Sequence, residues 1–182
     1  MRKSLYFECY SGISGDMTVA ALLDLGADRT VLEKVLSSLP LPGFKIKTGR
    51  VLKSGIDACD FDVVLDEDNH DHDMAYLHGH ENQEHTHHKT HSHSHNGHTH
   101  IHRGIKEIRE IIDRGEMTPH ARELALRIFE VLAQAEAKAH RVPVEDVHFH
   151  EVGAVDSIVD IISAAVCLDN LGIEEVIVPV LC

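Results

Sequence analysis

Apolar residues along the chain recur with two different periods. A spacing of about 3.6 residues predicts an amphipathic helix, and strict alternation predicts a strand. The pattern predicts strands over 4–10, 44–52, 56–65, 147–151 and 175–181, and helices over 17–25, 29–39, 105–114, 119–140 and 156–171. Because strands alternate with helices, we expect an α/β fold in which helices pack on a small mixed sheet.

The sequence also contains residues that favour the start of a helix or a turn at the predicted boundaries of these elements. Asp28 can cap the second helix, and Thr118 followed by Pro119 is a favoured opening for the fourth. Ser54 and Gly55 provide a turn between the second and third strands. The second strand is basic at alternate positions and the third is acidic, so opposite charges would favour an antiparallel pair.

The segment over 67–102 follows neither period. Thirteen of the seventeen histidines lie between residues 70 and 102, among Asp, Asn, Thr and Ser. Such a segment cannot bury enough apolar surface to offset the entropy lost on ordering. We therefore expect a disordered insertion, the histidine tract, that divides one α/β domain into the halves 1–66 and 103–182.

Imidazole is a good ligand for nickel, zinc and copper. The histidine tract therefore predicts storage or delivery of a transition metal, and a solvated linker without a specific ligand is the alternative. Its ligands are redundant and protons compete for them, so we do not expect the tract to be catalytic. The expected storage ligands are His85, His87, His88, His91, His93, His95, His98, His100 and His102.

Composition narrows the classes of function. The formal net charge of −13 argues against a nucleic-acid surface, which needs clustered Lys and Arg. No apolar run approaches the roughly 20 residues of a membrane helix, and the N-terminus lacks the apolar stretch of a signal peptide. The four cysteines lie far apart and form no CxxC pair, which is typical of reduced thiols. We expect a soluble cytoplasmic protein.

The segment SGISGD follows the first strand and opens the first helix. Backbone N–H groups and the helix dipole can bind an anion at such a point. The residues that would do so are Ser11, Gly12, Ser14, Gly15 and Asp16. The spacing fits neither a Walker loop nor a dinucleotide fingerprint. A plain turn with Asp16 as helix cap, a phosphate site and a cation site all remain open.

The segment VHFHEVGAVDSIVD is denser in candidate ligands. His148 and His150 would project from one face of a strand, and Asp156 and Asp160 lie one turn apart on the following helix. With Glu151 these residues could form a nitrogen–oxygen metal site. The alternative has Asp156 as helix cap, Glu151 solvated and the histidines bonded to backbone. The group as a whole favours a functional role, because a buried charge is tolerated only when paired or bound to metal.

The motifs SGISGDM and FHEVGAVDSIVDI, in this order around a histidine-rich insertion, resemble the family of nickel-insertion proteins of the lactate racemase cofactor pathway. These proteins are also called pyridinium-3,5-bisthiocarboxylic acid mononucleotide nickel chelatases. The resemblance covers essentially the whole chain, but only the N-terminal part of the family's length. Family members continue into a C-terminal domain, absent from this chain, that is associated with CTP and manganese.

The resemblance implies a nickel chelatase of the lyase class. Two thiocarboxylate sulfurs and one pyridinium carbon of the mononucleotide become nickel ligands, and CTP hydrolysis accompanies the reaction. Because that carbon loses its proton, a base near the metal is expected. The candidate catalytic residues are Glu151, Asp156 and Asp160, and the candidate nickel ligands are His148, His150, Asp156 and Asp160. The substrate phosphate is expected on the loop over 11–16.

The resemblance also implies partners. We expect a homo-oligomer that is either a separately encoded subunit working with a C-terminal domain or a truncated product, which could be inactive alone. A hypothesis from another class is a non-catalytic nickel store or metallochaperone in which the histidine tract is the whole function. A zinc hydrolase is a third, more distant alternative, since no HExxH pattern is present.

Overall fold

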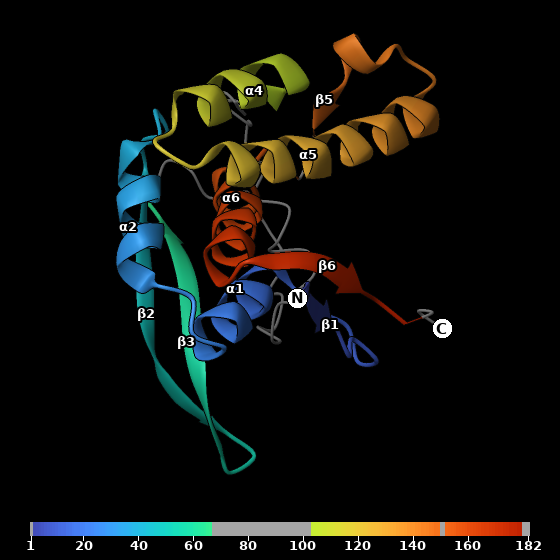
Figure 1. Cartoon of the computed structure of the whole chain (residues 1–182). Coiled ribbons are helices and arrows are strands. Elements are labelled where there is room, and N and C mark those ends of the chain that lie inside the picture. The colour runs from blue at the N-terminus through green and yellow to red at the C-terminus, as the bar shows by residue number, and fades with distance from the viewer. Residues whose placement is uncertain (1, 67–102, 150–151, 180–182) are drawn as a thin grey trace, which may run out of the picture.

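The structure is a computed structural model that describes residues 2–66, 103–149 and 152–179 (Figure 1). The first segment holds β1 (Lys3–Tyr6), α1 (Gly15–Asp24), α2 (Arg29–Ser38), β2 (Phe44–Lys53) and β3 (Ile56–Leu65). The other two segments hold β4 (Arg103–Gly104), α4 (Ile105–Arg114), α5 (Pro119–His140), the 3₁₀ turn η2 (Val144–Asp146), β5 (His148–Phe149), α6 (Val155–Leu171) and β6 (Ile173–Ile177). The order of elements follows the sequence prediction, and the α/β class is confirmed. The storage histidines of the tract, together with His150 and Glu151, lie outside the described residues.

Helix α6 is the centre of the fold. Its side chains Ile158, Val159, Ile162 and Ala165 are fully buried, as its almost wholly apolar sequence predicts. Helices α1, α2 and α5 and strand β3 pack around it, so both halves of the chain contribute to one apolar core (Figure 1). None of the helices in the described part of the chain is long and apolar enough to cross a membrane.

In the described part of the chain the strands form three separate pairs rather than one small sheet. Strands β1 and β6 are parallel, whereas β2 with β3 and β4 with β5 are antiparallel. At the outer side of β3, the backbone N–H of Cys59 donates to the carboxylate of Asp24 on α1 at 2.7 Å. A helix side chain therefore takes a hydrogen bond that a neighbouring strand would otherwise accept.

The predicted end signals are confirmed in three places. The Asp28 carboxylate accepts from the N–H of Thr30 at 2.8 Å and caps α2. The Thr118 hydroxyl accepts from the N–H of Ala121 at 3.1 Å and caps α5. Ser54 has a φ of 50° and the next residue, Gly55, one of 83°, in the turn between β2 and β3.

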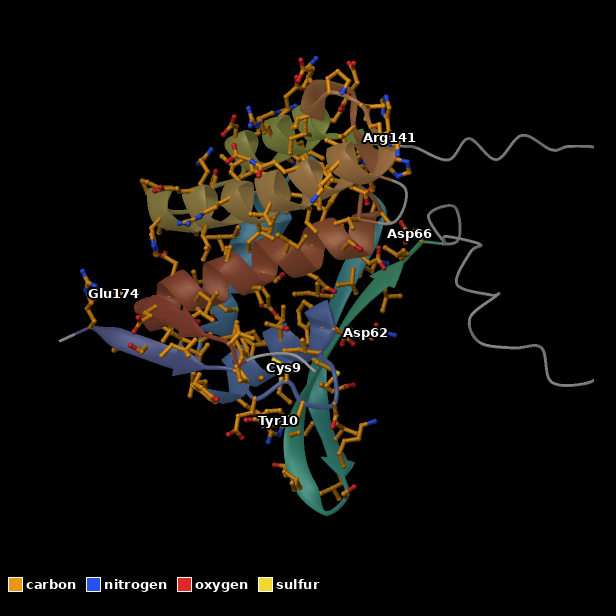
Figure 2. All side chains as sticks on the ribbon, turned by 90° about the vertical axis from the view of Figure 1, so that its right-hand side faces the viewer. Cys9, Tyr10, Asp62, Asp66, Arg141 and Glu174 are labelled. Atoms are coloured by element: carbon orange, nitrogen blue, oxygen red, sulfur yellow. The ribbon has the colours of Figure 1, made fainter. Side chains whose placement is uncertain are left out.

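The histidine tract joins the described structure close to the start of α6. It follows Asp66 at the end of β3 and precedes Arg103 in β4. Figure 2 shows Asp66 at this end of β3. The Arg103 guanidinium donates to the carbonyl of Gly153 at 3.0 Å, two residues before α6 begins.

Candidate functional site

The first turn of α1 lies against the side chain of Asp160 on α6. A Cβ atom added to Gly15 would stand 2.6 Å from the Cβ of Asp160 and 2.7 Å from its Cγ, which no real side chain tolerates. The glycine predicted to admit a phosphate therefore admits a carboxylate from the same chain. Any larger residue at this position would displace Asp160 or separate the two helices.

Burial and neighbouring charge both act on Asp160. Loss of solvent, followed by the negative charges of Asp16, Asp156 and Asp62, raises the pKa of its carboxyl from an ordinary value of 3.8 to about 7. The backbone N–H of Asp16 donates to the Asp160 carboxylate and opposes this effect only in part. Asp160 thus titrates near neutral pH, where a group can either hold or accept a proton.

We call Asp16, Asp62, Asp156 and Asp160 the carboxylate cluster. They come from α1, β3 and α6, three elements that pack on one another. Figure 2 shows Asp62 on β3, beside the blue helix α1. None of the ion pairs found in the described segments involves Asp16, Asp156 or Asp160. These negative charges are therefore gathered without a basic side chain to neutralise them.

Three buried oxygens on α6 lack a hydrogen-bond partner in the described structure. They are Oδ1 of Asp156, Oδ1 of Asp160 and Oγ of Ser163, and the Ser163 side chain is fully buried. The spacing of four and then three residues places all three on one face of the helix. A buried polar atom without a partner costs about 1–3 kcal/mol. An arrangement this costly is typical of a site that is completed by a ligand.

The loop over 11–16 has its predicted position but different hydrogen bonds. The N-cap of α1 is Ser14, whose hydroxyl donates to the Asp16 carboxylate, so Asp16 is not the cap. Ser11, Gly12 and Ser14 are exposed. Because the Asp160 carboxylate already accepts from the Asp16 N–H, an anion from α6 occupies the position proposed for phosphate. Binding of a phosphate at this loop stays a prediction.

Of the residues predicted in the segment VHFHEVGAVDSIVD, only the two aspartates are seen in the carboxylate cluster. Asp156 and Asp160 face it, and the N-cap of α6 is Ala154, so Asp156 is not a helix cap. His148 is exposed on β5, while Phe149 beside it is buried. Within residues 2–66, 103–149 and 152–179, no three His, Cys, Asp or Glu side chains are close enough to hold a metal ion as they stand.

Sequence reasoning missed two members of this region. Asp62 belongs to the alternation DFD, in which Phe61 is buried and the two aspartates are exposed. Ser163 is a fully buried polar residue on an almost wholly apolar helix, and no role was assigned to it from the sequence. Asp62 could not be assigned from local spacing, because β3 and α6 are about a hundred residues apart in the chain, whereas helical spacing places Ser163 one turn after Asp160 and could have found it.

Comparison with known proteins shows to which family the chain belongs. The sequence model of a family described as nickel insertion protein matches residues 5–181. The chain belongs to this family. The nickel insertion match contains the whole carboxylate cluster, from the loop before α1 to α6.

Curated relatives within the nickel insertion family are considerably longer than this chain. The pyridinium-3,5-bisthiocarboxylic acid mononucleotide nickel insertion protein of Alkaliphilus metalliredigens is 56% identical over 98% of this chain and 39% of its own length. Proteins of the same name from Geobacillus kaustophilus and Acetivibrio thermocellus are 43% and 39% identical, over 96% and 94% of this chain and 38% and 37% of their own lengths. The chain thus spans about two fifths of the relatives it matches. No solved structure matches it.

Proposed function

We propose that this chain is the nickel-binding part of an enzyme that inserts nickel into pyridinium-3,5-bisthiocarboxylic acid mononucleotide. The named relatives support the substrate and the metal. The observation that carries the proposal is the Asp160 carboxylate, held against Gly15 beside Asp16 and Asp156 and without an ion pair to any basic side chain that the structure describes. Enclosed negative charge of this kind favours a bound cation or an exchangeable proton.

Nickel is the metal substrate in this proposal, and α6 supplies part of its binding site. The unpartnered oxygens of Asp156 and Asp160 provide two carboxylate ligands. His150 and Glu151 precede the helix by only a few residues, and His148 lies on β5. Imidazole with carboxylate is a suitable ligand set for nickel. The site would form when these donors close on the ion.

The carboxylate cluster can also provide the base that removes the proton from the pyridinium carbon when the carbon–nickel bond forms. When nickel binds the pyridinium carbon, the C–H bond breaks, its electron pair remains on carbon to bind the metal, and the proton leaves. In the metal-free site Asp160 has a pKa of about 7, so its carboxylate can accept a proton at neutral pH through the oxygen that does not bind nickel. We assign this role to Asp160, with Asp156 and Glu151 as alternatives. Nickel keeps its oxidation state throughout.

The remaining parts of the reaction belong to the portion of the relatives that this chain does not match. CTP, manganese, the lyase class and a homo-oligomeric enzyme are proposed there by family resemblance, as is a cytoplasmic location. The free thiols of Cys9, Cys59 and Cys167 are consistent with a reducing compartment.

The test is a nickel-insertion assay on this chain fused to the part of the Alkaliphilus relative that lies outside the match. Asp156→Asn and Asp160→Asn should each lower the rate of product formation at least about a hundredfold, the scale typical of a lost general base. Asp60→Asn, an exposed aspartate on β3, should leave the rate unchanged. Normal rates in both cluster variants would overturn the site assignment.

A nickel store or metallochaperone remains a second candidate because of the density of histidine between 70 and 102. Replacing all thirteen tract histidines with serine separates the two functions. An enzyme should lose activity only when nickel is scarce. A storage protein should lose nickel delivery at every nickel concentration. In that case Asp156→Asn and Asp160→Asn should have no effect on delivery.

A further inference from the structure

Strands β1 and β6 form a parallel pair at the edge of the molecule. In Figure 1 they lie side by side at the lower right, away from β2 and β3. Leu5 is paired with Val176 and Tyr6 with Ile177, and the N–H of Phe7 donates to the carbonyl of Ile177 at 2.9 Å. The Ser4 hydroxyl donates to Glu175 at 2.6 Å. No third strand joins this pair among the described residues.

Side chains on both faces of this pair are partly exposed. Val176 and Ile177 are consecutive, so their side chains point to opposite faces, and each is 43% exposed. Leu5 packs against the core on one face, but its neighbour Val176 is only partly covered. Parallel strands are almost always buried on both faces, and the apolar run VIVPVL is typical of such strands. The exposure therefore contradicts what the sequence of β6 predicts.

Aromatic side chains extend the apolar surface. Tyr6 is 50% exposed and Tyr10 is 72% exposed, and their hydroxyl groups are hydrogen-bonded to each other. Val178, directly after β6, is 50% exposed. Tyrosine is enriched in the buried centres of protein interfaces, where it contributes large area at low entropy cost. We call Tyr6, Tyr10 and Ile177 the β1–β6 face, since Tyr6 and Ile177 are paired and their side chains lie on the same side of the two strands.

We propose that the β1–β6 face is the docking surface for the part of the enzyme that the longer relatives carry outside the matched region. The family match runs through β6 to residue 181, while the Alkaliphilus relative is matched over only 39% of its length. In the relatives this chain corresponds to the N-terminal part, so their remaining polypeptide leaves the domain directly beside this face. Such a connection gives the docking segment a high effective concentration there.

The occupant has a defined chemistry. It covers Tyr6 and Ile177 with apolar side chains and adds at least one strand to the open pair, because two parallel strands alone do not bury their faces. This inference does not depend on the carboxylate cluster, which lies on α1, β3 and α6. Failure of either proposal therefore leaves the other standing.

The test is amide hydrogen exchange of residues 3–10 and 173–179 in two proteins. One is this chain alone, and the other is its fusion to the unmatched part of the Alkaliphilus relative. Docking should slow exchange of these residues in the fusion by about tenfold or more. Residues 49–58 at the far end of the β2–β3 hairpin should exchange equally in both proteins. Equal exchange of residues 3–10 and 173–179 in both proteins would overturn the proposal.

Variants distinguish docking from a general stabilising effect of the fusion. Tyr6→Glu and Ile177→Glu should each abolish the slowing, whereas Leu52→Glu, at a 73% exposed position on the hairpin, should not. In this chain alone all three should keep the parent's circular dichroism and melting temperature, since each site is well exposed. Slowing that survives both face variants would contradict the proposal.

Sedimentation of this chain alone tests the other occupant, a second copy. A monomer agrees with the proposal. A dimer that Tyr6→Glu dissociates would assign the β1–β6 face to self-association and overturn it.

Discussion

The contact between α1 and α6 is apolar toward the C-terminal ends of the two helices and acidic toward their N-terminal ends. Toward the C-terminal ends, buried Val19 and Leu22 of α1 and Ile162 of α6 belong to the apolar core, and the N–H of Asp28 donates to Asn170 at 2.8 Å. At the N-terminal end, Gly15 meets the Asp160 carboxylate, close to two further aspartates. The same pair of helices thus combines an apolar contact with a polar one.

The difference between the apolar and the acidic end shows which part of the helix contact is explained by stabilisation of the fold alone. Burying apolar side chains stabilises the helix pair and needs no further explanation. Placing the partly buried Asp156 and Asp160 close to Asp16 and Asp62 costs free energy, because buried carboxylates lose hydration and neighbouring negative charges repel one another. The acidic end is therefore best understood as a site held in place by the apolar end, at some cost in stability.

The largest effect is expected at the apolar end. Ile162→Ala removes a fully buried side chain and should lower the free energy of unfolding by about 2–5 kcal/mol. The folded fraction should still bind nickel as the parent does. Urea denaturation and nickel titration measure the two quantities. Loss of nickel affinity comparable to that of Asp160→Asn would show that the two ends are not separable.

The next largest effect is expected for Gly15→Ala, at the acidic end of the helix contact. The added methyl group overlaps the Asp160 side chain, and overpacking of this kind costs about 1–3 kcal/mol. It should also displace the carboxylate and abolish nickel insertion by the fusion protein. Gly49→Ala is the matched control, since a Cβ there meets nothing within 4 Å. Parent-like stability of Gly15→Ala would contradict the described helix contact.

The acidic end should make stability depend on pH. Below about pH 4 Asp160 is protonated in both folded and unfolded chains. As pH rises to about 7 the unfolded chain loses this proton first, so stability falls across that window and then levels off. Asp160→Asn should remove this fall and be more stable than the parent at pH 8. Because the side chain is only partly shielded from solvent, we expect a gain on the order of 1 kcal/mol.

Thermal unfolding between pH 4 and pH 8 measures this dependence. Asp60→Asn is the control, and its profile should follow the parent's. A parent whose stability rises steadily over this window, with Asp160→Asn less stable at pH 8, would contradict a raised pKa for Asp160.

The smallest effect is expected at Ser163. Its hydroxyl is fully buried and unpartnered, so Ser163→Ala removes a group that gains nothing in the unliganded chain. The variant should be as stable as the parent or more stable by up to about 1 kcal/mol. Calorimetry without metal measures this. A loss above that size would indicate that the hydroxyl has a hydrogen-bond partner.

Much of the fold could be predicted because its signals are local. The caps Asp28 and Thr118, the turn at Ser54 and Gly55, and the apolar periods of α5 and α6 each depend on residues a few positions apart. The separation of the strands into three pairs could not be predicted. It depends on contacts such as that of Asp24 with Cys59, which local patterns do not encode.

The candidate site divides in the same way. The pair Asp156 and Asp160 follows from helical spacing, and the sequence correctly placed them on one face. The meeting of Gly15 with Asp160 joins residues more than a hundred positions apart, so local spacing could not predict it, and the sequence left the loop open as a plain turn, a phosphate site or a cation site. The family resemblance was confirmed, but it did not supply this geometry.

The most direct test of the central claim is a nickel titration of the full chain with all thirteen tract histidines replaced by serine. We predict one remaining nickel ion per chain, with oxygen and nitrogen ligands in its X-ray absorption spectrum. The ion should be lost in the added double variant Asp156→Asn, Asp160→Asn and kept in Asp60→Asn. No remaining nickel, or a remaining ion unaffected by the double variant, would contradict the account.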